Sequence, residues 1–356
     1  MVLLNRIKRT VAVALFVACD INTPANALPC LTDTLTFIGT GDIMMGTSYP
    51  STAYLPSGDC SSLFVHVADF LSGADITFGN LEGTFADTTV QPRKCRDTVN
   101  CYIFRMPASF ARCLAEAGYD VVSVANNHAG DFGSAGKEQT VNALRNTGLY
   151  YAGTIDQPCT FLTRRGYRIA LCAFATSGGT PSLLDTTYAK TVVTEAGREC
   201  DIVIVSMHGG AEGKDYQHVT RQDEEFLGYP RGNVHRFAHA MIDAGADIVF
   251  GHGPHVTRAV ELYRDRFIAY SLGNFCTYSR FNLRGPNGYA PAIKVFTDPR
   301  GGFIRAEVLP VRQPGPGIPH PDPGRTALHI LRELSETDFP ESMLLINGDG
   351  VILRKE

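Results

Sequence analysis

The sequence predicts an α/β protein built around a largely buried sheet. Apolar runs of β-type composition recur along the chain, and helix-length stretches separate most of them. They read LTFIGT, ADITF, DVVSVA, DIVIVSM, ADIVF and RFIAY, and a short motif rich in polar residues and glycine closely follows each one. Ligands of open α/β sheets bind at the carboxyl ends of the strands. We therefore expect these motifs to converge on one site.

The predicted elements follow one another along most of the chain. Strands are expected at 35–38, 75–78, 121–124, 168–175, 201–206, 247–250, 267–270 and 292–296. Helices are expected at 63–71, 108–117, 134–146, 222–244 (as one helix or two) and 326–334, and a further helix is expected to end at 195–198. Residues 83–105 form a long polar insertion, and a hairpin is expected about Asn347-Gly348-Asp349-Gly350.

Length and composition indicate an ordinary globular chain. Its 356 residues are 44% hydrophobic and carry a net charge of −4, so no basic field suggests a nucleic-acid partner. We expect a main domain over 31–312, a linker rich in Pro and Gly over 313–325, and a C-terminal helix and hairpin over 326–356.

The N-terminus has the pattern of an export signal. Three basic residues precede the short apolar run Val11–Ala18, and Ala25-Asn26-Ala27 offers a signal-peptidase site. The run is too short to span a bilayer, and a buried N-terminal helix is the alternative. We expect a signal peptide over 1–27, or a lipoprotein leader to residue 18 with Cys19 lipidated, and hence a periplasmic, cell-surface or membrane-anchored protein.

The cysteines agree with an oxidising compartment. Ten are present, and cleavage after Ala27 leaves nine, so at least one thiol stays free or pairs between chains. Cys95 and Cys101 flank a short polar loop, which predicts a local disulfide; metal binding by this pair is the weaker alternative. Cys172 lies in an apolar run and is expected to be a small buried hydrophobic residue.

The first three motifs supply carboxylates, amides and one imidazole. Asp42 follows the first strand, although Gly-Asp is also a common turn. Asn80 and Glu82 are two residues apart, so both can face one pocket in an extended segment. Asn126-Asn127-His128 is costly to bury unless it binds something, and a helix N-cap with a satisfied His is the alternative.

The later motifs supply three more imidazoles. His208 precedes two glycines that let the backbone approach a ligand, and Pro254 holds His252 and His255 in a rigid turn. With the carboxylates and an amide, these donors suffice for one or two divalent ions, with Mn, Fe or Zn as candidates. His128 could instead protonate a leaving group.

The series of motifs resembles the CapA family of capsule and poly-γ-glutamate synthesis proteins, itself similar to calcineurin-like metallophosphoesterases. The resemblance covers about Leu35 to Val311. It implies a four-layer sandwich, two packed sheets flanked by helices, with metal at the strand ends. By position it assigns His128 as the general acid. By position it also implies Asp42, Asn127, His208, His252 and His255 as metal ligands. Glu82, expected from the residues themselves, completes the predicted metal set, and the possible secondary residues are Asn80, Asn126, Glu212 and Asn274.

Two positions differ from the phosphoesterase pattern. Met44 stands where a His is usual, and Asn80 stands where a bridging Asp is usual. The resemblance implies an exported protein that acts on an anionic surface polymer or its precursor, with membrane synthase subunits as further partners. A metal-dependent hydrolase or transferase is the favoured hypothesis. The alternative is a non-catalytic polymer-handling subunit, in which Arg93, Lys94, Arg96 and Arg105 could grip carboxylates unless they are simply solvated.

Overall fold

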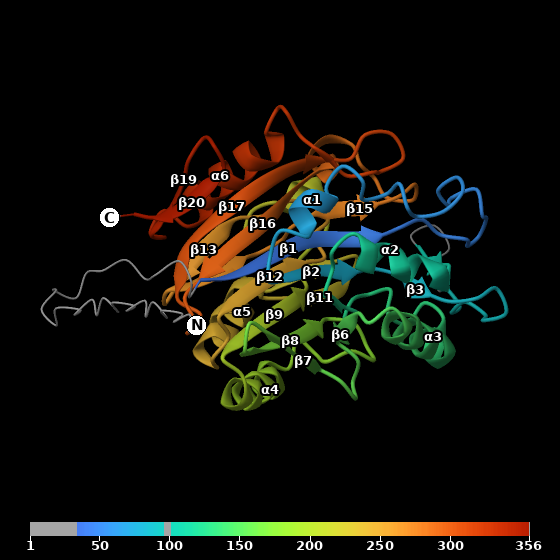
Figure 1. Ribbon diagram of the computed structural model, residues 1–356, viewed down its shortest axis with the longest axis horizontal. Helices are drawn as coiled ribbons and strands as arrows, with labels where there is room; N and C mark the ends of the chain where they lie inside the picture. The colour runs from blue at the N-terminus through green and yellow to red at the C-terminus, as the bar shows by residue number, and fades with distance from the viewer. Residues whose placement is uncertain (1–33, 96–100, 356) are drawn as a thin grey trace, which may run out of the picture.

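Two β-sheets packed face to face, with helices on both outer faces, make up the protein (Figure 1). The computed structural model describes residues 34–95 and 101–355. The predicted α/β sandwich with two sheets and flanking helices is confirmed. The predicted leader over 1–27 and the shorter one to 18 lie outside the described residues. Within the described ranges, no helix is long and apolar enough to cross a membrane.

The first sheet has ten strands and carries the first three motifs. Its strands are β1 (Leu35–Met44), β2 (Ile76–Leu81), β5 (Val121–Ser123), β6 (Tyr150–Ala152), β15 (Asn274–Thr277), β16 (Tyr289–Thr297), β17 (Phe303–Arg312), β18 (His320–Pro321), β19 (Leu344–Ile346) and β20 (Val351–Arg354). The main path runs β19-β20-β17-β16-β1-β2-β5-β6, with β15 also on β1 and β18 on β17. Because β1, β2, β5 and β6 are parallel, their carboxyl ends share one edge.

The second sheet has six strands in the order β13-β14-β12-β9-β8-β7. Their bounds are β7 (Cys159–Arg164), β8 (Tyr167–Ala175), β9 (Ile202–His208), β12 (Ile248–His252), β13 (Val260–Tyr263) and β14 (Arg266–Ala269). The four inner strands are parallel, whereas β7 and β13 are antiparallel edges. Fully parallel inner strands need cover on both faces, which explains their unbroken apolar runs.

Three apolar layers hold these sheets and helices together. Alternate residues of β9 divide between two of them: Ile202 and Ile204 face the core between the sheets, whereas Val203 and Val205 face the helices. The helices are α1 (Ala68–Leu71), α2 (Ala111–Glu116) and α3 (Gly133–Asn146) on the first sheet, α4 (Thr186–Glu199) and α5 (Val234–Asp243) on the second, and α6 (Thr326–Asp338). Leu331 of α6 joins the inter-sheet core and Leu334 the outer one, so α6 closes an end of the sandwich (Figure 1).

Short elements bracket the insertions. They are β3 (Thr84–Phe85), β4 (Arg105–Met106), β10 (Glu224–Phe226), β11 (Tyr229–Gly232) and the 3-10 turns at Ala108–Phe110, Lys214–Tyr216 and Gly285–Gly288. The strands β3 and β4 pair with each other and close the long insertion after Glu82.

The predicted helix over 222–244 is wrong in its first half. A hairpin of β10 and β11 occupies that half, with Leu227 and Gly228 at positive φ in its turn. Pro230 and Gly232 oppose a helix there, and α5 begins only after Asn233, whose side chain accepts a hydrogen bond from the Arg236 N–H. The helix predicted at 63–71 is likewise reduced to the short α1.

The C-terminal segments belong to the first sheet. In the predicted linker 313–325, β18 pairs with β17, and the Gln313 side chain is buried and bonded to both Thr277 and Asn274. The predicted helix and hairpin of 326–356 are present, and β20 pairs with β17. These segments therefore continue the first sheet through β18 and β20.

Three disulfides lie in the described part of the chain. They join Cys60 to Cys113, Cys95 to Cys101 and Cys159 to Cys172. The structure thus holds the predicted Cys95–Cys101 pair. The expectation that Cys172 is merely a buried hydrophobic residue is wrong, because Cys159 lies directly opposite it across β7 and β8, with 4.0 Å between the two Cα atoms. Cys200 and Cys276 are free thiols.

Candidate metal centre

Side chains from both sheets meet where the parallel strands end. Asp42 lies near the end of β1, Glu82 directly follows β2, His208 ends β9, and His252 ends β12. All four are fully buried. Ligand atoms of Asp42, Glu82 and His208 lie within 4.8 Å of one another, so one cation could contact both sheets.

Glycine allows the chain to pass through this crowded edge. A Cβ on Gly41 would lie 1.9 Å from the carbonyl oxygen of Gly273. That carbonyl accepts a hydrogen bond of 2.8 Å from the backbone N–H of Asp42. The Gly41-Asp42 motif therefore needs its glycine so that β1 can lie against β15 and hold the carboxylate in place.

Two asparagines orient the carboxylates. The side-chain amide of Asn80 donates to Asp42 at 2.8 Å and to Glu82 at 3.3 Å. The Asn126 amide donates to the side-chain oxygen of Asn80 at 3.1 Å and to the carbonyl of Leu81 at 2.8 Å. Since both polar atoms of Asn80 are engaged, it positions Asp42 and Glu82, and Asn126 in turn positions Asn80.

His255 bridges the same two carboxylates. Its Nδ1 lies 2.9 Å from Asp42 Oδ2, and its Nε2 lies 3.5 Å from Glu82 Oε1. Burial alone would lower the pKa of His255, but the charges of Glu82 and Asp42 outweigh it and raise the pKa to about 10. His255 is therefore an imidazolium at neutral pH, and it supplies positive charge between the two acids.

His252 and His208 are held in their neutral forms. His252 Nε2 donates to the carbonyl of Thr40 at 3.0 Å, which leaves Nδ1 as the lone-pair nitrogen. Burial lowers the pKa of His252 to about 4. Burial, followed by the charge of Arg231, lowers the pKa of His208 to about 3. Neutral imidazoles are the form that binds metal.

Buried polar atoms without a hydrogen-bond partner gather at this edge. In the described residues, the following predicted site atoms are in this state: Glu82 Oε1, Asn127 Oδ1, His208 Nδ1 and Nε2, His252 Nδ1 and Asn274 Oδ1. Buried polar groups are normally hydrogen-bonded, so a concentration of unpaired ligand atoms indicates a site for a bound group. The donor set of carboxylate, imidazole and amide fits a divalent ion.

The pKa values of the two buried carboxyls, Asp42 and Glu82, are shifted in opposite directions. Burial of Asp42 would raise the pKa of its carboxyl, but the hydrogen bond and charge of His255 and the neighbouring His252 and His208 hold the pKa well below its usual range. Glu82 behaves oppositely, because burial raises its pKa to about 8 despite the charge of His255. The two acids therefore differ in protonation at neutral pH.

His128 forms a separate pair beside this cluster. Its Nδ1 lies 2.8 Å from Asp131 Oδ2, and Asp131 also accepts from the Arg93 guanidinium and the Phe104 N–H, both at 2.9 Å. Burial opposes a charged His128, but Asp131, together with the charge of Glu82, raises its pKa. Asp131 therefore fixes the ring and favours its proton-carrying form. Sequence reasoning missed Asp131, although a carboxylate three residues after a His was a usable signal.

Glu212 and Asn274 lie at the margin of the cluster. Glu212 pairs with Arg231 at 3.0 Å, and Arg231 also donates to the carbonyl of Gly210 at 2.7 Å. A Cβ on Gly253 would meet both the Arg231 guanidinium and the His208 ring, so this buried cation lies next to His208. Asn274 donates to the backbone carbonyl of His255 at 3.2 Å. Sequence reasoning missed Arg231, since nothing in the Pro-Arg-Gly sequence around it distinguishes it.

The basic residues of the insertion have other partners. Arg93 binds Asp131, and Arg105 donates to Ser48 and lies over the rings of Tyr49 and Phe132. Lys94 is exposed, and Arg96 lies outside the described residues.

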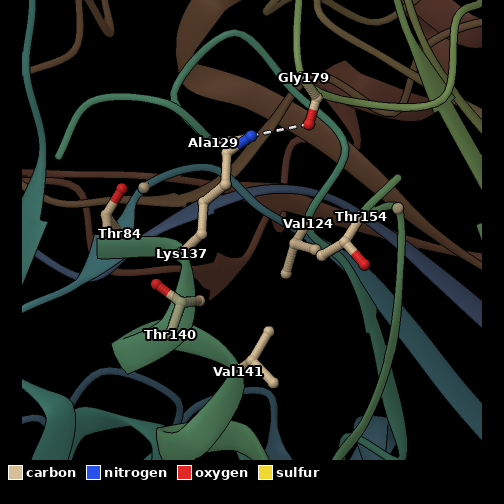
Figure 2. A pocket seen from close by; sticks show the side chains of 10 residues that line it. Thr84, Val124, Ala129, Lys137, Thr140, Val141, Thr154 and Gly179 are labelled. Atoms are coloured by element: carbon tan, nitrogen blue, oxygen red, sulfur yellow. Dashed lines mark hydrogen bonds between the residues drawn. The ribbon is translucent and has the colours of Figure 1, made fainter. Parts of the chain in front are cut away.

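A small cavity is lined in part by residues that directly follow the second and third motifs in the sequence (Figure 2). Its volume is about 20 Å³, room for about one water. Thr84 and Ala129 line it, and Lys137 crosses it to donate to the carbonyl of Gly179 at 2.7 Å. None of the predicted site residues lines this cavity.

Several known proteins are similar to the chain in sequence. The chain is 28% identical to the capsule biosynthesis protein CapA of Bacillus anthracis over 271 residues, which cover 68% of this chain and 59% of that protein. It is 29% identical to the PGA biosynthesis protein CapA of Bacillus subtilis over 295 residues, which cover 78% of this chain and 72% of that protein. A probable polyglutamine synthesis accessory protein of Mycobacterium tuberculosis is 28% identical to the chain over 275 residues, which cover 68% of this chain and 67% of that protein.

Similarity to solved structures is weaker. A phosphatase from Mycoplasma pneumoniae gives a TM-score of 0.49 at 13% identity, covering 82% of this chain and 96% of that one. Likeness at this level carries no information on chemistry. A protein-family model gives the stronger result. Residues 36–279 match the family described as bacterial capsule synthesis protein PGA_cap, and the chain belongs to that family.

Proposed function

We propose that the protein is an exported, divalent-metal-dependent hydrolase or transferase that acts on an anionic cell-surface polymer, such as a capsule or poly-γ-glutamate, or on its precursor. The observation that carries the proposal is the group of unpaired, buried ligand atoms where the two sheets meet. Names of relatives that include capsule and PGA biosynthesis support the polymer as the substrate class.

The residues present fit a metal ion. Asp42, Glu82 and His208 would hold it, with His252 Nδ1 and Asn127 Oδ1 as further donors. Bound there, a divalent ion would polarise a phosphoryl or acyl oxygen and activate a water. A set of carboxylates and neutral imidazoles suits Mn²⁺, Fe²⁺ or Zn²⁺ better than Mg²⁺, which prefers oxygen ligands.

The protein's own groups would bind substrate and move protons. The buried Arg231 guanidinium beside His208 would attract a carboxylate or phosphate of the polymer, with Glu212 limiting its mobility. His128, oriented by Asp131, would donate the proton that the leaving group requires.

Metal retention in a His252→Ala variant tests the centre. The variant should lose metal while circular dichroism shows an unchanged fold, because it removes a ligand and leaves the sheets intact. The exposed His329 on α6 provides the matched control, since His329→Ala removes an imidazole that belongs to neither group of potential metal ligands. Metal that persisted at the wild-type level in the His252 variant would contradict the proposal.

Catalysis is tested separately from metal binding. Metal-loaded wild-type protein should turn over a generic phosphodiester or release glutamyl units from poly-γ-glutamate, whereas His128→Asn should keep the metal and lose turnover. Metal binding without turnover of any substrate would favour the non-catalytic, polymer-handling alternative.

Export is proposed from the leader pattern, and the three disulfides support it because they persist in oxidising compartments. N-terminal sequencing of extracytoplasmic protein should begin at Leu28 or show a lipidated Cys19. An intact Met1 in a cytosolic fraction would defeat this part of the proposal.

A further inference from the structure

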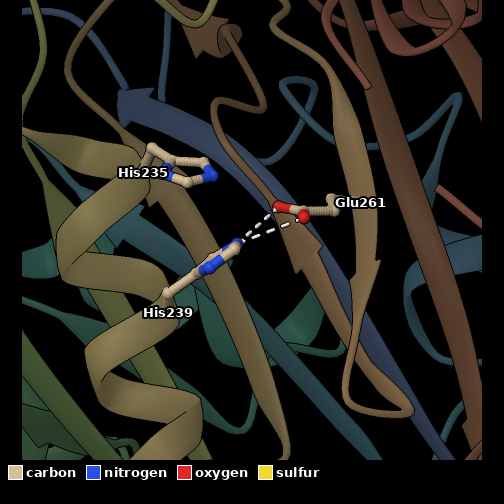
Figure 3. A group of neighbouring side chains, drawn as sticks. All are labelled: His235, His239 and Glu261. Carbon is tan, nitrogen blue, oxygen red and sulfur yellow. Dashed lines mark hydrogen bonds and ion pairs between the residues drawn. The ribbon is translucent and has the colours of Figure 1, made fainter. Parts of the chain in front are cut away.

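A second group of potential metal ligands lies on the outer side of the six-stranded sheet (Figure 3). His235 and His239 come from α5, and Glu261 comes from the edge strand β13. Their ligand atoms all lie within 4.8 Å of one another. None of the three was among the predicted site residues, and none contacts the first cluster in the described interactions.

Helix geometry brings the two imidazoles together. Residues four apart lie on the same helix face, and the ring centroids of His235 and His239 are 4.0 Å apart. Figure 3 shows both rings directed from α5 toward the Glu261 carboxylate. Two imidazoles at i and i+4 are a common arrangement for binding one transition-metal ion.

Glu261 is held in place from two directions. His239 Nε2 lies 2.9 and 3.1 Å from its two oxygens, and the buried Tyr270 hydroxyl donates to Oε2 at 2.6 Å. The ring of Tyr263 stacks on His239 at 3.7 Å. Fixed ligands of this kind, with hydrogen bonds behind them, are what metal sites in proteins usually contain.

An ordinary ion pair accounts for only part of this arrangement. It explains His239 and Glu261, but not the third member. His235 makes ring contacts with His239, Tyr270 and Phe339, yet within the described part of the chain it has no hydrogen bond. A cation shared by both imidazoles and the carboxylate gives His235 a role.

We propose that His235, His239 and Glu261 bind a divalent transition-metal ion of the Zn²⁺ class, separate from the candidate metal centre. Two imidazoles and one carboxylate favour Zn²⁺, Co²⁺ or Ni²⁺ over Mg²⁺ and Ca²⁺. Three protein ligands leave a position for water, and the His239 side chain keeps 20% of its surface exposed, so ions have access. The ion would take the place of the hydrogen bond that now joins His239 Nε2 to the Glu261 carboxylate at 2.9 Å.

The bound ion would fasten α5 to the sheet edge. The strand β13 has only one neighbour in its sheet, β14, and its other side depends on side-chain and loop contacts. Phe339, at the end of α6, stacks on both His235 and Tyr270, at 5.9 and 5.1 Å. Metal at this point would therefore also stabilise the packing of α6.

The test is Zn²⁺ binding by the full chain in the His252→Ala background, in which the first centre is disabled. The sites do not depend on each other, so either proposal can fail alone. The protein should bind one equivalent of Zn²⁺ and gain thermal stability. Adding His235→Gln should weaken binding by about 100-fold or more, and Tyr270→Phe should weaken it by about 10–100-fold by loosening Glu261.

Controls separate binding from folding. His235 is half-buried and lacks a hydrogen bond, so His235→Gln should retain the wild-type circular dichroism and metal-free melting temperature. His329→Gln in the same background should keep the full Zn²⁺ affinity. Co²⁺ bound at the site should give the visible bands of a tetrahedral complex, and these should vanish with His235→Gln. Equal Zn²⁺ affinity and equal melting shift with and without His235 would overturn the proposal, as would failure of the parent to bind Zn²⁺.

Discussion

Replacing Glu82 by Gln should make the metal-free protein more stable while weakening the metal binding proposed for the site. Glu82 is fully buried, and one of its oxygens has no hydrogen-bond partner. Burial raises its pKa from 4.5 to about 8. The folded protein therefore holds a proton that the unfolded chain releases, and the free energy of unfolding falls as pH rises between these two values.

The size of the effect follows from that shift. At pH 7 the ordinary carboxyl is ionised in the unfolded chain and neutral in the folded one, which corresponds to a penalty of about 3 kcal/mol. Gln has no such penalty, and its oxygen can still accept from Asn80. Part of this gain in stability is lost because the Glu82 carboxylate also stabilises the charged form of His255, whose pKa it raises. A net gain of about 1–3 kcal/mol at pH 7 is expected.

Chemical denaturation of chelator-treated protein at several pH values measures this effect. The difference between variant and wild type should shrink toward pH 4.5 and grow toward pH 8. Glu138→Gln, at an exposed position of α3, serves as the control and should change stability little. A Glu82→Gln variant that was less stable than wild type, or whose effect did not depend on pH, would refute the electrostatic description of the site.

Three further outcomes are expected. Replacing both Cys60 and Cys113 by Ala should lower the free energy of unfolding in urea by about 4 kcal/mol, because this disulfide closes a long loop with a sequence separation of 53. Replacing Cys95 and Cys101, whose separation is 6, should lower it by only about 2 kcal/mol, and equal losses would contradict this chain-entropy reasoning. Arg258→Met leaves the buried Glu224 carboxylate without its bidentate partner and should lower the free energy of unfolding by about 3–5 kcal/mol. The double variant that also carries Glu224→Gln should recover part of this loss. Asp131→Asn should lower the pKa of His128, which an NMR titration of the ring can follow, and should move the alkaline limb of any activity profile to lower pH.

The strands and the meeting of the motifs could be predicted because they rest on local rules. An apolar run such as that of β9 must be buried on both faces, and parallel strands must end at one edge. Asp42, Glu82, His208 and His252 each follow such a run directly, so their convergence was a consequence of chain geometry.

The remainder depends on contacts between distant segments. Asp131 and Arg231 matter through their partners His128 and Glu212, and no periodicity identifies such pairs. The hairpin of β10 and β11 is an exception, because Pro230 and Gly232 already oppose a helix in the sequence and the prediction of a helix gave them too little weight. Cys172 could be paired only once β7 was known to lie opposite β8.

His255 connects the fold of the candidate centre with its chemistry. Two carboxylates in a dry pocket repel each other, and burial of a second negative charge is costly. In the metal-free protein the site limits that cost in two ways: Glu82 takes up a proton, and His255 contributes a positive charge between Glu82 and Asp42. The protein can therefore fold before it acquires an ion. An incoming divalent cation would replace both of these protons, so its affinity should rise with pH over the range in which Glu82 and His255 would otherwise hold them. The same residues thus allow the metal-free centre to form and would make the metal binding proposed for it depend on pH.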